Sequence, residues 1–237
     1  MMKKYKAVFL DWDDTIGDFH GAADLALAEM YEKYQLDRYF ASLEEFVGLY
    51  KPHNLELWAK YGEDKVTKEY LSLDRFLFPL MHGNLYKNGE LAEVVQLAIT
   101  LSDDFLALTT AHFSLLPGAE ELVRYLADKY PLTIVTNGFI EVQYEKFDKS
   151  GLKDYFSHIV LSEEVGCQKP NSRIYEEALR LNGLSADEVV MVGDSWYSDI
   201  QGAINAGIDQ IWVTDKPVDG SEPTYVVKSL EEIKSIL

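Results

Sequence analysis

The sequence predicts an α/β fold, a parallel sheet between helices, with an all-helical domain inserted into it. Short runs rich in β-branched and aromatic residues alternate with helical patterns over most of the chain, which is typical of such sheets. Most of these runs are apolar nearly throughout, as expected for strands that are covered on both faces. The alternation is interrupted once, between the first and second runs.

The elements of the sheet can be assigned in order. The expected strands are Ala7–Leu10, Leu132–Val135, His158–Leu161, Val189–Val192, Gln210–Val213 and Tyr225–Val227. Helices are expected between them at Glu120–Lys129, Arg173–Leu181 and Ser198–Ala206. Pro170 suits the start of the second helix, and Gly207 suits the end of the third. Short links between strands and helices indicate parallel pairing.

The interruption runs from about Gly17 to Ala111 and shows helical periodicity without a convincing strand. The expected helices there are Ala22–Tyr34, Ser42–Tyr50, Leu55–Tyr61, Thr67–Phe78 and Leu91–Thr109. An ordinary crossover between parallel strands needs far fewer residues. Pro117 and Gly118 mark the return to the sheet. We therefore expect a core of residues 1–16 and 112–237 and a helical domain of residues 17–111.

Composition and charge exclude several classes of partner. The chain has 237 residues and a net charge of −18, so it repels nucleic acid polymers. No apolar run approaches the ~18 residues that a membrane helix needs, and the apolar stretch after the first lysines is too short for a signal peptide. The single cysteine, Cys167, forms no intrachain disulfide. We expect a cytoplasmic protein without a membrane partner, and its oligomeric state stays open.

Polar residues follow the expected strands where each strand ends. Ligands bind beyond the carboxyl ends of the strands in an open parallel sheet. The segments at these ends are Asp11-Trp12-Asp13-Asp14-Thr15, Thr136-Asn137-Gly138, Ser162-Glu163-Glu164 with Lys169-Pro170 beyond it, and Gly193-Asp194-Ser195 followed by Asp199. We therefore expect carboxylates, a hydroxyl and a lysine to meet at one edge.

Crowded carboxylates at this edge predict a site for Mg²⁺, which prefers oxygen ligands. Asp11 and Asp194 are the expected direct ligands, and the backbone carbonyl of Asp13 could supply another oxygen. Asp199 would orient the ligands or bind through water. Helix capping or turn formation could explain Asp199 or Asp14 alone, but it explains poorly why two strands both end in aspartate.

The D-x-D spacing predicts that the two aspartates have different roles in the reaction. Asp11 can act as a nucleophile, because a carboxylate near a cation stays ionised. Asp13 can protonate the leaving group and then take a proton from water. Phosphoryl oxygens would be held by Thr136, Asn137 and Lys169.

The order D-x-D-x-T, T-N-G, Lys-Pro and G-D-S-x-x-x-D resembles phosphatases of the haloacid dehalogenase-like (HAD) superfamily that carry a helical C1 cap. The resemblance implies a Rossmann-like core, Mg²⁺ and an aspartyl-phosphate intermediate. It implies Asp11 as nucleophile and Asp13 as acid and base, with Thr136 and Lys169 as phosphate binders. Asp194 and Asp199 would lie at the metal. Gly138 would belong to the substrate-binding loop, and Phe19, at the hinge into the cap, could contact substrate.

A narrower resemblance concerns the substrate. The strings IVTNGF, GLKDYF, SEEVGCQKPN and INAGI are similar to house-cleaning pyrimidine 5′-nucleotidases, which act on nucleoside 5′-monophosphates. Matching cap residues are Asn54, Leu57, Trp58, Tyr61, Arg75 and Phe76. The expected function is therefore a Mg²⁺-dependent phosphomonoester hydrolase that acts on nucleoside 5′-monophosphates, a 5′-nucleotidase whose partner is a small phosphorylated metabolite.

Four alternatives stay open. A broad-specificity phosphatase for sugar phosphates or phosphoglycolate has the same motifs. A dehalogenase has no use for a second carboxylate two residues after the first, so Asp13 argues against it. A phosphomutase or a non-catalytic binding module is less well supported, since every expected catalytic residue is present.

Overall fold

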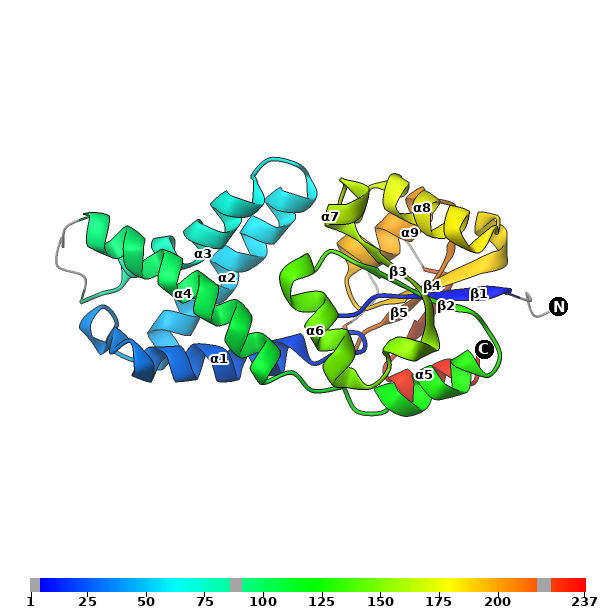
Figure 1. The fold of residues 1–237 in the computed structure, drawn as a ribbon, viewed down its shortest axis with the longest axis horizontal. Helices are drawn as coiled ribbons and strands as arrows, with labels where there is room; N and C mark the ends of the chain where they lie inside the picture. Colours follow the sequence, from blue (N-terminus) through cyan, green and yellow to red (C-terminus); the bar gives the residue numbers. More distant parts are fainter. Residues whose placement is uncertain (1–4, 86–90, 217–222) are drawn as a thin grey trace. The chain divides into compact units, whose positions relative to one another are not determined.

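A computed structural model describes residues 5–85, 91–216 and 223–237. The chain divides into two compact units, Met1–Phe19 with Phe113–Leu237 and His20–His112. The first unit contains the sheet and the second consists of helices (Figure 1). The predicted fold class, an α/β core with an inserted helical unit, is confirmed. No helix within the described ranges is long and apolar enough to cross a membrane.

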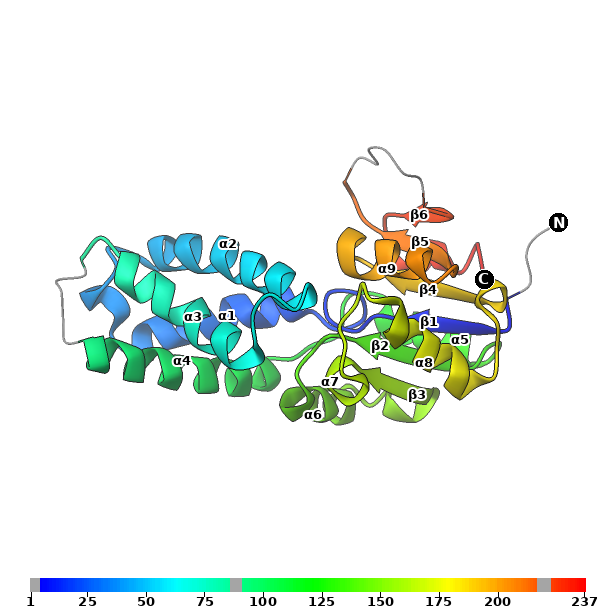
Figure 2. The ribbon, with the colours of Figure 1, turned by 90° about the horizontal axis from the view of Figure 1, so that it is seen from above.

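The strands of the described residues form one six-stranded sheet in which every pairing is parallel. They are β1 (Ala7–Leu10), β2 (Leu132–Thr136), β3 (Phe156–Leu161), β4 (Val189–Gly193), β5 (Asp209–Val213) and β6 (Tyr225–Val227). Their order is β3-β2-β1-β4-β5-β6, as Figure 2 shows. The order reverses between β1 and β4, and such a switch point is where open α/β sheets bind ligands.

Helices cover both faces of the sheet. In the described core they are α5 (Ala119–Ala127), α6 (Ile140–Ser150), α7 (Ser162–Val165), α8 (Ser172–Asn182), α9 (Gln201–Asn205) and α10 (Leu230–Ile233), with a π-helical turn at Trp196–Ile200 and short 3₁₀ turns at Lys153–Tyr155 and Ala186–Glu188. In Figure 1, α8 and α9 lie on one face and α5 on the other.

The apolar strands bury side chains on both of these faces. Val8 and Leu10 of β1 pack with Phe147 of α6 and with residues of α5. Ala7 and Phe9 pack on the opposite face with residues of α8 and α9. All four β1 residues are buried, which explains why the strand is apolar without alternation.

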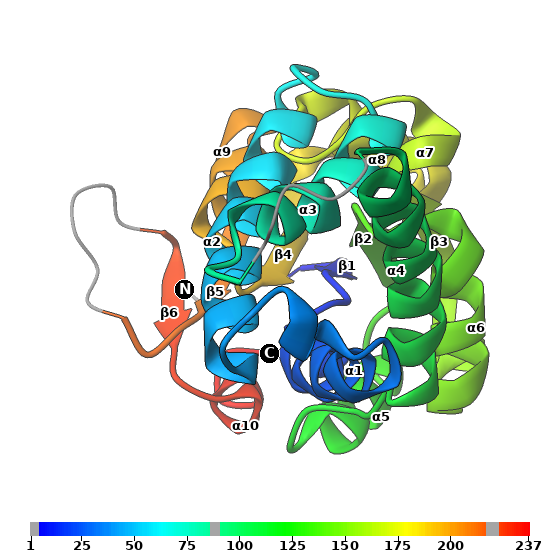
Figure 3. The same ribbon diagram turned by 90° about the vertical axis from the view of Figure 1, so that its left-hand side faces the viewer.

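The helical unit contains α1 (Phe19–Lys33), α2 (Leu43–Gly62), α3 (Lys68–His82) and α4 (Leu91–Ala111), with a 3₁₀ turn at Leu36–Arg38. Figure 3 shows α1 nearly end-on, with the turns of α2 and α4 running obliquely across the view. Their aromatic side chains pack in the interior, where Tyr50 lies 5.0 Å from Phe76 and Phe76 lies 5.5 Å from Phe105 between ring centroids.

Two helix predictions differ from the structure. The ranges expected as separate helices, Ser42–Tyr50 and Leu55–Tyr61, belong to the single helix α2, which runs through Pro52. Its buried face continues on both sides of the exposed proline, so packing outweighs the local cost of proline. The helix expected at Ser198–Ala206 begins earlier, with the π-helical turn that contains Asp199.

Candidate active site

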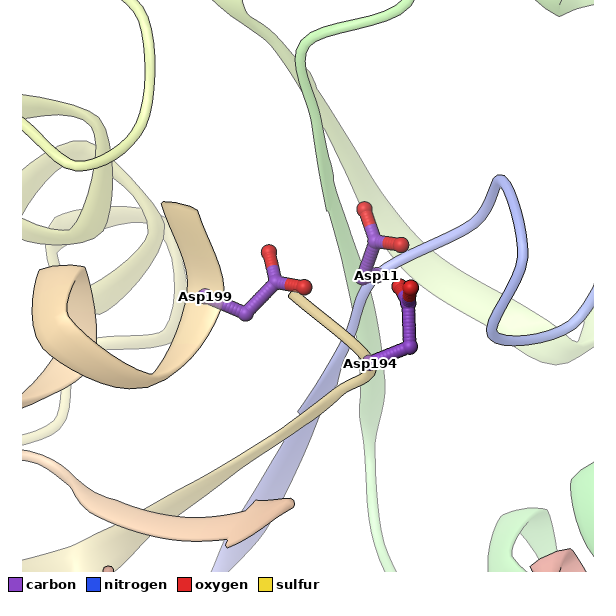
Figure 4. A group of neighbouring side chains, drawn as sticks. All are labelled: Asp11, Asp194 and Asp199. Atoms are coloured by element: carbon purple, nitrogen blue, oxygen red, sulfur yellow. The ribbon is translucent and has the colours of Figure 1, made fainter. Parts of the chain in front are cut away.

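Three carboxylates converge at the carboxyl ends of β1 and β4. Asp11 follows β1, Asp194 follows β4, and Asp199 lies in the π-helical turn (Figure 4). One carboxylate oxygen from each lies within 4.8 Å of the others. The amide of Asp11 donates to Val192 O at 2.9 Å, so the β1–β4 ladder holds Asp11 in place. π-helical turns are rare and often occur at functional sites.

Lys169 lies among these carboxylates and is only 2 % exposed. Its Nζ lies 2.5 Å from Asp11 Oδ1 and 2.6 Å from Asp199 Oδ1. The side chain of Asn137 holds the backbone of Lys169, since Asn137 Oδ1 accepts from Lys169 N at 2.8 Å and Asn137 Nδ2 donates to Lys169 O at 3.0 Å. Asn137 thus fixes the position of the lysine.

The electrostatics of this cluster show an excess of negative charge. Burial, together with the charges of Asp199 and Asp194, raises the pKa of Asp11 well above its usual value. Burial and the neighbouring charges of Asp199 and Asp14 raise the pKa of Asp194 to about 7. Burial lowers the pKa of Lys169, but the two carboxylates outweigh it and the net pKa is above the ordinary lysine value. One ammonium thus faces three carboxylates, and a divalent cation with oxygen ligands fits the remaining charge.

Asp194 is held by a residue to which the sequence analysis gave no role. The hydroxyl of Thr15 donates to Asp194 Oδ1 at 3.1 Å and accepts from Asp194 N at 3.1 Å. Trp212 Nε1 donates to the backbone oxygen of Asp194 at 2.8 Å. The signal for Thr15 was its place in D-x-D-x-T, whereas the sequence pattern alone did not indicate Trp212.

Asp199 is fully buried, and its backbone environment fixes its carboxylate. Ser195 N donates to Asp199 Oδ2 at 3.1 Å. A Cβ at Gly193 would lie 2.4 Å from the same oxygen, so the glycine of G-D-S makes room for this carboxylate. Tyr175 OH donates to Ser198 O at 2.8 Å, which ties the π-helical turn to α8.

Asp13 lies in a second group of side chains. Its Oδ1 accepts from Lys146 Nζ at 2.9 Å, and its Oδ2 accepts from Gln143 Nε2 at 2.8 Å. The same Gln143 nitrogen donates to Thr136 Oγ1 at 3.0 Å, which also accepts from Gly138 N at 3.1 Å. The carboxylate of Asp13 is not part of the cluster formed by Asp11, Asp194 and Asp199.

The residues beside the two acids shape the turn. Trp12 is fully buried and packs edge-on against Phe147, with ring centroids 4.6 Å apart. Its side chain therefore belongs to the core. Asp14 has a φ of 64°, a left-handed conformation that aspartate adopts more readily than most residues. Phe19 lies beside Lys146, whose Nζ is 4.9 Å from the ring centroid.

The structure thus brings Asp11, Lys169, Asp194 and Asp199 together, with Asn137 behind the lysine. It places Asp13, Thr136 and Gly138 in a second group, connected by Gln143, and puts Phe19 against Lys146. The sequence pattern did not indicate Gln143 and Lys146. Both lie on α6, which follows T-N-G, and polar residues on a helix normally face solvent, so the sequence pattern gave no signal for their burial.

Comparison with known proteins gives matches over nearly the whole chain. A family model described as haloacid dehalogenase-like hydrolase matches residues 5–207. The pyrimidine 5′-nucleotidase PynA of Streptococcus pneumoniae is 31 % identical over 98 % of this chain and 95 % of its own length. A glyceraldehyde 3-phosphate phosphatase of Methanothermobacter thermautotrophicus is 30 % identical over 98 % of this chain and 99 % of its own.

Among solved structures, the HAD-hydrolase YfnB of Bacillus subtilis, bound to magnesium, matches with a TM-score of 0.84. It is 30 % identical, and the match covers 99 % of each chain.

Proposed function

Because this chain belongs to the haloacid dehalogenase-like hydrolase family, we propose that it is a Mg²⁺-dependent phosphatase for nucleoside 5′-monophosphates, with Asp11 as its nucleophile. The observation that carries the proposal is the separation of the two motif acids. Asp11 lies against Lys169 in the carboxylate cluster, whereas Asp13 is held by a different cation, Lys146. Two carboxylates in different surroundings can take different roles in one reaction.

In the first half-reaction an oxygen of Asp11 attacks phosphorus and the bond from phosphorus to the leaving oxygen breaks. Asp13 donates a proton to that oxygen. In the second half-reaction Asp13 takes a proton from water, which attacks the phosphoryl group and releases inorganic phosphate and Asp11. Lys169 and the hydroxyl of Thr136 hold phosphoryl oxygens.

Mg²⁺ would be held by Asp11, Asp194, Asp199 and the backbone carbonyl of Asp13. When bound, it supplies positive charge that offsets the charge of the phosphate. Thr15 keeps the carboxylate of Asp194 directed toward the cluster, and Ser195 does the same for Asp199.

The substrate assignment is supported by the full-length similarity to the pyrimidine nucleotidase. We propose that residues 17–111 form a cap that selects the substrate, as in the C1-capped branch that the sequence resembles. A sugar-phosphate phosphatase is the second candidate, because the glyceraldehyde 3-phosphate phosphatase matches over the same extent. The net charge of −18 favours a small phosphorylated metabolite over a nucleic acid polymer.

The test measures phosphate release by the purified protein, with Mg²⁺ and with EDTA. The substrates are UMP, dUMP, dTMP, GMP, glyceraldehyde 3-phosphate and phosphoglycolate, and Asp11→Asn is the control. Turnover concentrated on pyrimidine monophosphates and lost in Asp11→Asn supports the proposal. Turnover mainly on the other esters would agree with the proposed mechanism and refute the proposed substrate class. No Mg²⁺-dependent turnover refutes both.

A further inference from the structure

Lys146 is a buried cation to which the mechanism above gives no part. It is 3 % exposed, and within the described ranges Asp13 is the acidic side chain that pairs with it. Removing an ammonium from water is unfavourable, and one ion pair often fails to offset this cost. Replacing both partners of such a pair by apolar side chains is often neutral or stabilising, so the pair is weak evidence for a role in stability. The lysine therefore calls for an explanation other than stability.

Gln143 presents the same problem three residues earlier on α6. It is fully buried, and its Nε2 donates to both Asp13 and Thr136, while its Oε1 has no hydrogen-bond partner in the part of the chain that the structure describes. A buried oxygen without a hydrogen-bond partner destabilises the fold, because it has lost its bonds to water and gained none. The loop is also shaped around this side chain, since a Cβ at Gly138 would lie 1.7 Å from Gln143 Nε2.

One face of α6 contacts Trp12 and Asp13 of the D-x-D segment. Gln143, Lys146 and Phe147 have the spacing i, i+3, i+4, which places them on one side of a helix. Phe147 packs on Trp12, and the other two hold the two oxygens of Asp13. The N-terminus of α6 is itself fixed, because Ile140 N donates to Glu163 Oε1 at 3.2 Å. The helix thus sets both the position and the rotation of the Asp13 carboxylate.

We propose that Gln143 and Lys146 are positioning residues that hold the carboxylate of Asp13 toward the leaving oxygen of the substrate. The inference rests on the proposed function and extends it. Each carboxylate oxygen has two lone-pair directions, so an oxygen bonded to Gln143 or Lys146 keeps a second one for the transferred proton. Without the two donors the carboxylate rotates freely, and an acid in the wrong orientation transfers its proton slowly.

The test uses the dependence of proton transfer on the leaving group. p-Nitrophenolate departs without protonation, whereas an alkoxide such as the 5′ oxygen of a nucleoside needs it. The variants are Lys146→Met and the nearly isosteric Gln143→Met. We compare kcat/KM, which reports steps up to leaving-group departure, for p-nitrophenyl phosphate and for the alkyl phosphate that the wild type prefers.

We expect kcat/KM for the alkyl ester to fall about 10–100-fold in each variant, and that for the aryl ester to fall less than about 3-fold, since general acid catalysis contributes about 10²–10⁴-fold. Lys146→Arg should recover most of the alkyl-ester activity. Lys149→Met is the matched control, since Lys149 lies exposed on the same helix and pairs with Glu145. Thermal unfolding of each variant confirms that it is folded.

An equal loss on both esters would overturn the inference, because a general structural defect has that effect, and so would wild-type activity in both variants. A wild type that hydrolyses neither ester gives a different result, since it refutes the proposed function itself and the inference with it.

Discussion

The two units each bury a cation, and the surroundings of these cations are opposite. Lys169 in the core and Arg75 in the helical unit are each 2 % exposed. Lys169 lies within 2.6 Å of two carboxylates. Arg75 donates to the neutral oxygens of Ser102, at 3.0 Å to Oγ and 3.3 Å to the carbonyl, and within the described ranges it has no acidic hydrogen-bond partner. A buried charge alone therefore does not distinguish the active site from the interior of the helical unit.

The difference also appears in the pKa values. Burial lowers the pKa of Arg75, and the nearby Tyr50 and Asp103 only partly oppose this change. Burial also lowers the pKa of Lys169, but the two carboxylates raise this pKa by more than burial lowers it. In the core cluster the negative charges of the carboxylates therefore outnumber the positive charge of Lys169. In the helical unit the positive charge of Arg75 is only partly offset by its neighbours. Removing one cation should be costly in the core and nearly neutral in the helical unit.

The largest expected effect is that of Lys169→Met. The variant leaves Asp11 and Asp199 buried without their ammonium, and breaking a buried ion pair in this way costs about 3–5 kcal/mol of unfolding free energy. The loss should be greater at pH 8 than at pH 5, because Asp11, whose pKa is raised by burial and by the neighbouring carboxylates, takes up a proton at the lower pH and loses part of its repulsion. Urea unfolding at both pH values measures it. A loss below about 1 kcal/mol at pH 8, the range of an exposed pair, would contradict it.

Binding of Mg²⁺ should reduce the excess negative charge of the same carboxylate cluster and so stabilise the folded state. The folded-state pKa of Asp194 is about 7, above its unfolded value, so without metal the stability from this group falls as pH rises from about 4 to 7. Mg²⁺ binds the ionised carboxylates, and at 100 times its Kd it adds about 2.7 kcal/mol. The increase in Tm with Mg²⁺ should therefore be larger at pH 8 than at pH 5. Asp194→Asn is the control and should lose most of this increase. An equal increase at both pH values would refute the assignment of the site to these carboxylates.

The same contrast explains what could be predicted from the sequence. Runs such as Ala7–Leu10 are apolar because both faces are covered, and the acids that follow them must share one edge of a parallel sheet. Strand order and the contact between Asp11 and Lys169 depend on pairing between distant parts of the chain, so they could not be predicted. The shared edge of the sheet could be predicted, and it limits where such contacts form. The position of α2 across Pro52 could not be inferred, because local preference for a break was outweighed by packing in the helical interior.

Burial of Gln143, Lys146 and Arg75 was harder to foresee. Polar and charged residues on a helix normally face solvent, so pattern alone places them outside. Their partners, Asp13 and Ser102, are far away in the sequence. Only Thr15, inside the first motif, carried a local signal, and its two hydrogen bonds to Asp194 lead to the next prediction.

Thr15→Val should weaken Mg²⁺ binding without removing a ligand. The variant keeps the shape of a fully buried side chain but loses the bond to Asp194 Oδ1 and the acceptor for Asp194 N. Loss of a group that orients a metal ligand costs about 10-fold in affinity, which corresponds to about 1.4 kcal/mol. Titration with Mg²⁺ at pH 8 measures the Kd. Thr15→Ser, which keeps the hydroxyl, should bind nearly as the wild type. An unchanged Kd in Thr15→Val would show that Asp194 does not need this support.

The smallest expected effect is that of Arg75→Met. Methionine fills a similar volume, removes a buried charge that has neutral partners, and lets Ser102 Oγ turn toward its own helix. Among the described residues, neither Nε of this arginine nor the nearby Tyr50 OH has a hydrogen-bond partner, so the hydrogen bonding of the arginine is incomplete. The free energy of unfolding should change by less than about 1 kcal/mol, since apolar replacements of buried charges are often neutral or stabilising. Leu71→Ala, at a fully buried position of the same helix, is the control and should cost about 2–5 kcal/mol. A loss of similar size in Arg75→Met would mean that the helical unit depends on its cation as much as the core depends on Lys169, and the comparison of the two units would fail.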